Sequence, residues 1–188
     1  MANEVDWNDI SKKSLTEDVL RGLSDFVNWR LVFQHSPLSE GFMEEFATEE
    51  DWTIISRYQT LSEHFMEKHL DLLDWVAVSH YQTLSEPFIR KYSEKLDMDL
   101  VSAFQKLSEN MMRDYQDQLN WRYITRYQSF SEAFVLEFQN EVDMCYLLRH
   151  KLHLLSDNFY TLHYRKVICI LLSEICNRSS FFDPFNEP

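Results

Sequence analysis

Glycine and proline are scarce in this chain, with 2 and 4 copies among 188 residues. Sheets joined by tight turns usually need more of both, so their scarcity favours helices. Cysteine is also rare, and Cys145, Cys169 and Cys176 are odd in number and form no CxxC pair. This usage is typical of a protein in a reducing compartment and argues against a disulfide framework.

Targeting and membrane-spanning segments are missing from the pattern as well. The first residues, MANEVDWNDISKK, are acidic where a signal peptide would be basic and then apolar. The longest aliphatic run is VICILL at 167–172, far short of the roughly 20 residues that cross a bilayer. We therefore expect an intracellular, cytoplasmic protein that has no membrane partner.

Basic residues are few relative to acidic ones, 18 against 31, and the net charge is −13. Such a charge repels phosphate backbones, so direct nucleic-acid binding is not expected. It fits solubility, a basic protein partner, or mimicry of a nucleic acid. The chain is 45% apolar and 15% aromatic, which is enough to bury the core of one domain.

The chain does contain a repeat with a period of 23 residues. One series of apolar residues with this spacing is Leu15, Leu38, Leu61, Leu84, Leu107 and Phe130, and a second is Trp29, Trp52, Trp75, Met98, Trp121 and Met144. Both series keep the same interval, so we predict an all-α fold, an α-solenoid of two-helix repeats. Its predicted parts are a degenerate half-repeat (5–14), tandem repeats (15–152), a longer capping helix (within 153–178) and a tail (179–188).

Each repeat contains two residues that favour the start of a helix. The first is Thr16, Ser39, Ser62, Ser85, Ser108 or Ser131, followed in the serine copies by a glutamate that favours the positive end of the helix. The second is Asn28, Asp51, Asp74, Asp97, Asn120 or Asp143. Apolar residues between these positions recur at offsets of three and four, which predicts short helices with one buried face.

The consensus W-x-x-I-S-x-Y-Q-x-L-S-E-x-F resembles a short helical repeat of uncharacterised proteins from bacteriophages and large DNA viruses. The resemblance covers nearly all of residues 5–152. It implies an α-helical array and a viral or phage origin. It assigns no activity, and no catalytic residue follows from it.

Residue patterns for catalysis or for cofactors are absent from the sequence. There is no glycine-rich phosphate loop, no G-x-S-x-G and no HExxH. His150 and His153 have the spacing of a metal pair, yet no spacing completes a four-ligand set with His163 or the cysteines. We therefore expect a protein that is not an enzyme and binds neither a cofactor nor a metal.

A Tyr-Gln pair recurs at Tyr58–Gln59, Tyr81–Gln82 and Tyr127–Gln128, with Phe104–Gln105 in the remaining copy. Our preferred interpretation is that the rings pack between repeats and the glutamines bond free backbone groups. The alternative is a ladder of polar groups along a groove. Just before the rings lie Arg57, His80, Arg126 and Arg149, with Ala103 interrupting the series; they complement helix dipoles or form a ligand-facing ridge.

The excess of acidic residues is concentrated in residues 38–83, and the tail is rich in phenylalanine. The candidate partner-binding residues are therefore Glu40, Glu44, Glu45, Glu49, Glu50, Glu63, Glu67, Asp71, Phe181, Phe182 and Phe185. An acidic surface favours docking of a basic protein, although it also occurs as a merely solvated face. The tail FFDPFNEP has the composition of an anchor for another protein, of a segment that folds back, or of a self-association element.

The function that we predict is a non-enzymatic protein–protein interaction module or scaffold, viral or from a phage. Its partner would be another protein, basic or nucleic-acid-binding. Two alternatives stay open: a host-defence inhibitor that mimics a nucleic acid, and a structural component of a virion. The sequence leaves the identity of the partner and the oligomeric state open.

Overall fold

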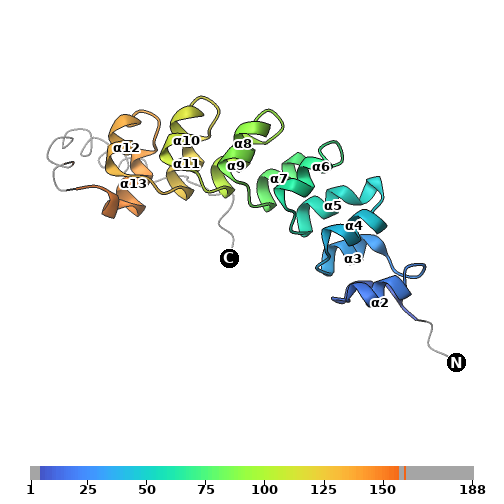
Figure 1. The fold of residues 1–188 in the computed structure, drawn as a ribbon. Helices are drawn as coiled ribbons and strands as arrows, with labels where there is room; N and C mark the ends of the chain where they lie inside the picture. The colour runs from blue at the N-terminus through green and yellow to red at the C-terminus, as the bar shows by residue number, and fades with distance from the viewer. Residues whose placement is uncertain (1–4, 157–158, 160–188) are drawn as a thin grey trace.

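The structure, a computed structural model, describes residues 5–156 and residue 159. These residues contain helices and no strand. The first helices of the repeats are α2 (Glu17–Gly22), α4 (Glu40–Phe46), α6 (Glu63–Lys68), α8 (Glu86–Tyr92), α10 (Glu109–Asp114) and α12 (Glu132–Glu137). The second helices are α3 (Trp29–His35), α5 (Trp52–Tyr58), α7 (Trp75–Tyr81), α9 (Met98–Phe104), α11 (Trp121–Tyr127) and α13 (Met144–His150). A half-repeat helix, α1 (Trp7–Ser11), precedes them, and the pairs stack into a curved array (Figure 1). The predicted α-solenoid is confirmed.

Capping by short polar side chains sets the start of nearly every helix. The hydroxyl of Ser62 accepts a bond from the amide of Phe65 at 3.1 Å, and a carboxylate oxygen of Asp74 accepts from Val76 and Ala77. The other capping serines and the Asp or Asn residues before α3, α9, α11 and α13 make equivalent bonds. These bonds satisfy amides that a helix leaves unpaired in its first turn.

Two of the predicted caps differ in the structure. The side chain of Thr16 makes no capping bond at the start of α2. Asp51 does not cap α5, because a 3-10 turn, η1 (Glu49–Asp51), precedes that helix and Asp51 bonds back to Thr48. The prediction for Asp51 was wrong because its carboxylate accepts from the amide and the hydroxyl of Thr48 and makes no bond to the amides of α5.

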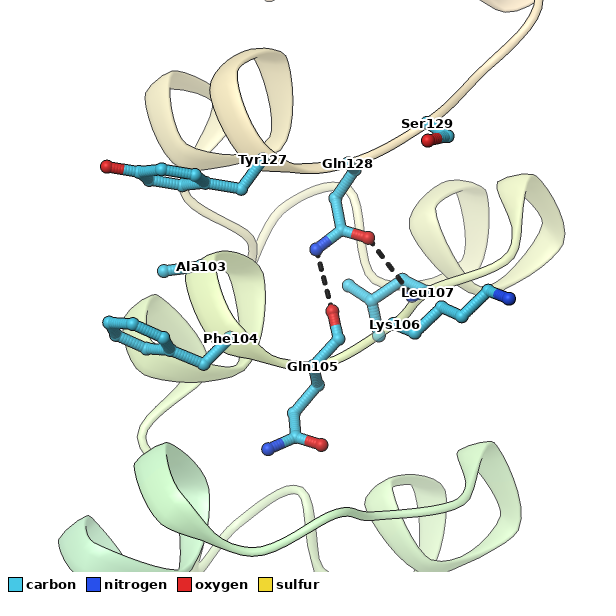
Figure 2. Close-up of a pocket in the computed structure, with 8 residues that line it drawn as sticks. All are labelled: Ala103, Phe104, Gln105, Lys106, Leu107, Tyr127, Gln128 and Ser129. Carbon is cyan, nitrogen blue, oxygen red and sulfur yellow. Dashed lines mark hydrogen bonds between the residues drawn. The ribbon is translucent and has the colours of Figure 1, made fainter.

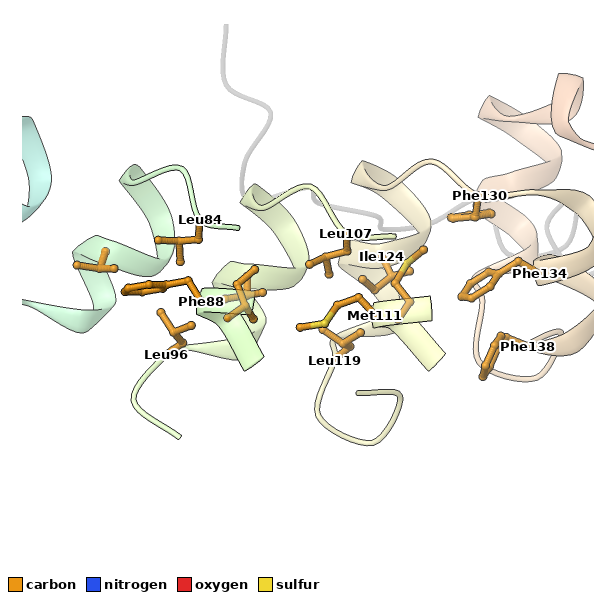
Figure 3. Close-up of a cluster of buried hydrophobic side chains, with 14 of the residues drawn as sticks. Leu84, Phe88, Leu96, Leu107, Met111, Leu119, Ile124, Phe130, Phe134 and Phe138 are labelled. Carbon is orange, nitrogen blue, oxygen red and sulfur yellow. The ribbon is translucent and has the colours of Figure 1, made fainter. Parts of the chain in front are cut away.

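The core lies between the two layers of helices and continues from repeat to repeat. Each second helix packs against the next one, from α3 through α5, α7, α9 and α11 to α13. Figure 3 shows the apolar side chains filling the interval between pairs, with Leu84, Phe88 and Leu96 in one repeat and Leu107, Met111 and Leu119 in the next. Helices of 5 to 7 residues are not stable alone, so this burial between neighbours is what holds them.

The buried glutamines Gln59, Gln82, Gln105 and Gln128 form a hydrogen-bond series that we call the glutamine ladder. In Gln82, the amide nitrogen donates to the carbonyls of Ser56 (2.9 Å) and Gln59 (2.7 Å), and the amide oxygen accepts from Leu61 at 3.0 Å. The other members of the ladder make the same three bonds in their own repeats. Each glutamine thus pairs backbone groups that the end of a second helix leaves without partners.

Two further series of bonds join consecutive repeats. The hydroxyl of Ser79 donates to the carbonyl of Trp75 and accepts from the amide of Asp97, 18 residues later. The glutamate after each first-helix cap accepts from the backbone amide of the capping residue in the next repeat, as Glu63 does from Ser85 at 2.6 Å. The glutamates therefore join repeats, in addition to the predicted effect on the helix dipole.

At its C-terminal side the described array keeps its bonds despite a change in spacing. A 3-10 turn, η2 (Leu152–Leu154), takes up the extra residues, and Ser156 still bonds Glu132 through its amide and its hydroxyl. Lys151 replaces a glutamine and donates to the carbonyl of Gln128 at 2.6 Å. The predicted capping helix and the tail lie outside the described residues. Among the described helices, none has the length and apolar character of a membrane span.

Candidate functional site

Four aromatic side chains at equivalent positions are exposed along the array. They are Tyr58, Tyr81, Phe104 and Tyr127, the last residues of α5, α7, α9 and α11, and their exposed fractions are 45%, 46%, 50% and 50%. Each of these rings precedes a buried glutamine of the ladder. The backbone conformation that places the glutamine side chain inside the array leaves the preceding ring facing outward. We call these four rings the aromatic row. We expected these rings to pack between repeats as part of the core; they remain about half exposed instead. The predicted bonding of the glutamines to backbone groups is confirmed.

The side chain before each ring lies against the aromatic row. The guanidinium of Arg57 is 5.4 Å from the ring centre of Tyr58 and 5.1 Å from that of Tyr81. The imidazole of His80 is 3.9 Å from the ring of Tyr81 and 3.8 Å from that of Phe104. In two successive intervals of the row, a planar nitrogen-bearing group therefore contacts both neighbouring rings, the geometry of cation–π and stacking contacts.

His80 is held in an environment that disfavours its charged form. Its Nδ1 is buried and has no hydrogen-bond partner among the described residues. Burial lowers the pKa of His80, and the positive charge of Arg57 lowers it further. The imidazole is therefore mainly neutral at pH 7 and acts between Tyr81 and Phe104 as an aromatic group.

The third interval of the row lacks such a group, because Ala103 occupies the position of Arg57 and His80. A cavity of about 320 Å³ lies here, lined by Ala103, Phe104, Gln105, Lys106, Leu107, Tyr127, Gln128 and Ser129. Figure 2 shows the rings of Phe104 and Tyr127 projecting on the same side with Ala103 between them, while Lys106 extends toward the opposite side. We call this place the Ala103 gap.

The predicted acidic residues divide into two groups in the structure. Five of them are engaged between repeats: Glu40 and Glu63 accept from Ser62 and Ser85, Glu44 pairs with Lys68 and His69, Glu45 with Arg21, and Glu67 with Lys91. The Lys68 ammonium, with His69, lowers the pKa of Glu44, and Lys91 lowers that of Glu67. Glu49, Glu50 and Asp71 are exposed and form no ion pair with any described residue.

The remaining candidates give no site in the part of the chain that the structure describes. His150 and His153 are exposed, and the ring of His150 lies 4.5 Å from that of Tyr146. No group of three or more metal-binding side chains occurs among residues 5–156 and 159. His163, Cys169, Cys176, Phe181, Phe182 and Phe185 lie outside the described residues, so their predicted roles stay predictions.

Comparison of the chain with protein-family models, curated proteins and solved structures finds no significant match. The sequence contained one usable signal for the Ala103 gap, the replacement of a cation by Ala103 within a series of Arg and His. That signal has a meaning only once the rings on both sides are known to be exposed.

Proposed function

We propose that the chain is a non-enzymatic protein–protein interaction module, and that the aromatic row is its contact face. The observation that carries the proposal is that four rings at equivalent positions are 45–50% exposed. Aromatic side chains and arginine are the residues that most often dominate binding energy at protein interfaces. Solenoids bind along rows of equivalent positions, since stacking of repeats sets such residues in a line.

The other recurring side chains already have partners inside the array. The glutamine ladder, the hydroxyl series of Ser79 and the glutamate series of Glu63 all bond between repeats. Five of the eight predicted acidic residues bond between repeats as well. This use inside the scaffold favours the aromatic row over the acidic surface as the main contact. Glu49, Glu50 and Asp71 remain as charges that would steer a basic partner toward the array.

The net charge of −13 favours a protein partner over a nucleic acid, whose phosphates it repels. The resemblance of the repeat to viral and phage repeats adds the expectation that the partner is met inside an infected host cell. The two expectations are separate, and the contact face does not depend on the viral origin.

Affinity capture from the native cell, with partners quantified by mass spectrometry, tests the proposal. The row variant Phe104→Ser/Tyr127→Ser should lose the partner that the unmodified chain captures. The matched control, Glu49→Gln/Glu50→Gln, changes exposed side chains away from the row and should keep most of it. Loss of the partner in the Glu49/Glu50 variant alone would instead assign the contact to the acidic surface.

A further inference from the structure

We infer that the Ala103 gap binds an arginine side chain of a basic partner segment, whose guanidinium inserts between the rings of Phe104 and Tyr127. This inference deepens the proposed function and rests on the aromatic row being the contact face. Its starting point is that the array itself shows what two equivalent intervals hold. Arg57 contacts Tyr58 and Tyr81, and His80 contacts Tyr81 and Phe104.

The size and the walls of the gap suit this ligand. Its volume of about 320 Å³ is at the low end of the roughly 300–1,000 Å³ of ligand sites, enough for one large side chain with some adjoining backbone. Phe104 and Tyr127 are each 50% exposed, so their rings offer surface to a ligand. Arginine stacks on aromatic faces more readily than lysine because its guanidinium is planar and less strongly hydrated.

The polar groups that line the gap do not call for a different ligand. The amide of Gln128 is fully used, since its nitrogen donates to Ser102 and Gln105 and its oxygen accepts from Leu107. The ammonium of Lys106 would repel a cation at close range, but its side chain extends away from the two rings (Figure 2). The site thus recognises its ligand mainly through two aromatic faces.

Charge complementarity supports a basic partner. The whole chain has a net charge of −13, and Glu49, Glu50 and Asp71 are exposed without ion pairs among the described residues. These three residues lie within residues 38–83, whereas the repeats that form the gap have no net charge. The field therefore steers a basic segment toward the array and repels an acidic peptide or a nucleic acid, and the rings supply the contact at the gap. Charge attraction alone would act equally on arginine and lysine. A preference for the arginine peptide over the lysine peptide therefore measures the contribution of the rings.

The test is a titration of the full, ¹⁵N-labelled chain with the peptide Gly-Ser-Gly-Arg-Gly-Ser-Gly, followed by backbone chemical shifts around Phe104 and Tyr127. Matched peptides carry lysine, citrulline or phenylalanine at the central position. The arginine peptide should bind best, and citrulline, which keeps the shape but not the charge, should weaken binding by roughly tenfold. A phenylalanine peptide that binds more tightly would overturn the assignment of a cationic ligand.

The variant Ala103→Arg should supply the guanidinium from within the chain and fill the gap, as Arg57 does in its own interval. We expect it to weaken binding of the arginine peptide by roughly tenfold or more. Thr60→Arg adds the same charge at an exposed turn and should weaken that binding less than about twofold. Equal losses in both variants would show simple charge attraction and contradict the inference.

Other occupants give distinct results in the same experiment. Oligothymidylate that shifts the Phe104 and Tyr127 signals, and does so only while Ala103 is present, would show a base-stacking site and overturn the inference. No shift at these residues with any peptide would overturn it too. The proposed function would survive that failure if the row variant still loses its captured partner, since capture reports the whole row and the titration reports one interval.

Discussion

Ser79 shows at the scale of one residue how an ordinary side chain holds two repeats together. Its hydroxyl donates to Trp75 in its own helix at 2.7 Å and accepts from the amide of Asp97 in the next repeat at 2.9 Å. Thr125 makes the same pair of bonds in a later repeat. The recurring hydroxyl therefore links two repeats, because the same oxygen donates one hydrogen bond and accepts another.

Replacing Ser79 by alanine removes both bonds and leaves the amide of Asp97 without its partner. We expect a loss of about 1–2 kcal/mol in the free energy of unfolding, measured by urea titration. Ser79→Thr should lose much less, because a threonine already serves at position 125. A loss in Ser79→Thr as large as in Ser79→Ala would show that packing, rather than the hydroxyl, decides the residue.

The glutamine ladder makes a stronger prediction for Gln82, which bonds three buried backbone groups. Gln82→Met keeps the length of the side chain but leaves two carbonyls and one amide unpaired, so we expect a loss of about 3 kcal/mol. The neighbouring exposed Thr83→Ala should lose almost nothing in the same denaturation experiment. Equal stability of the two variants would contradict the ladder.

His80 links the aromatic row to pH. Burial and Arg57 lower its pKa in the folded chain, so near its pKa the unfolded chain binds more protons than the folded one. The stability that His80 contributes is fully present above the unfolded pKa near 6.5 and is lost as pH falls through the folded pKa. The difference in thermal midpoint between pH 8 and pH 5.5 should therefore be smaller in His80→Gln than in the unmodified chain.

At the scale of helices, much of the structure could be predicted from the sequence. Ser62 and Asp74 set the starts of α6 and α7 because their side chains reach the amides of their own first turn, an interaction within four residues. The prediction for Asp51 was wrong because its carboxylate bonds the preceding Thr48 instead of the helix that follows. The predicted role of Glu63 was incomplete, because its partner Ser85 is 22 residues away in sequence and becomes a neighbour only when the repeats stack.

The exposure of the aromatic row could not be predicted either, because it also depends on how the repeats stack. Tyr81 has the spacing of a core residue, and its exposed fraction depends on where the next repeat lies. The buried Gln82 and the exposed Tyr81 are adjacent in sequence, and the ladder decides which of the two is turned inward. Periodicity alone does not distinguish them, because both recur every 23 residues.

The ion pairs between first helices give a prediction at this scale. Glu44 and Glu45 pair with Lys68 and Arg21 of neighbouring repeats, whereas Glu49 and Glu50 are exposed without such pairs. Glu44→Lys/Glu45→Lys should lower the thermal midpoint, and less so at high salt, because like charges then face each other. Glu49→Lys/Glu50→Lys changes the net charge equally and should lower the midpoint less, since it breaks no ion pair and only removes favourable charges from the first turn of η1.

For the whole molecule, the described array separates scaffold from surface. Each repeat is held by its neighbours through the core, the glutamine ladder and the bonds of Ser79 and Glu63, so stability is shared along the array. The aromatic row lies outside this network, with rings half exposed and one interval open at Ala103. What recurs in the interior keeps the repeats stacked, and the place where the row departs from its pattern is where we propose that a partner is distinguished.

The most direct test of this separation is the amount of partner captured per folded chain by two variants, Phe104→Ser/Tyr127→Ser and Gln82→Met. Circular dichroism at the capture temperature gives the folded fraction. The account predicts that the row variant is folded and loses its partner, whereas the ladder variant is less stable and its folded fraction keeps the partner. A folded row variant that still captures the full amount would contradict it.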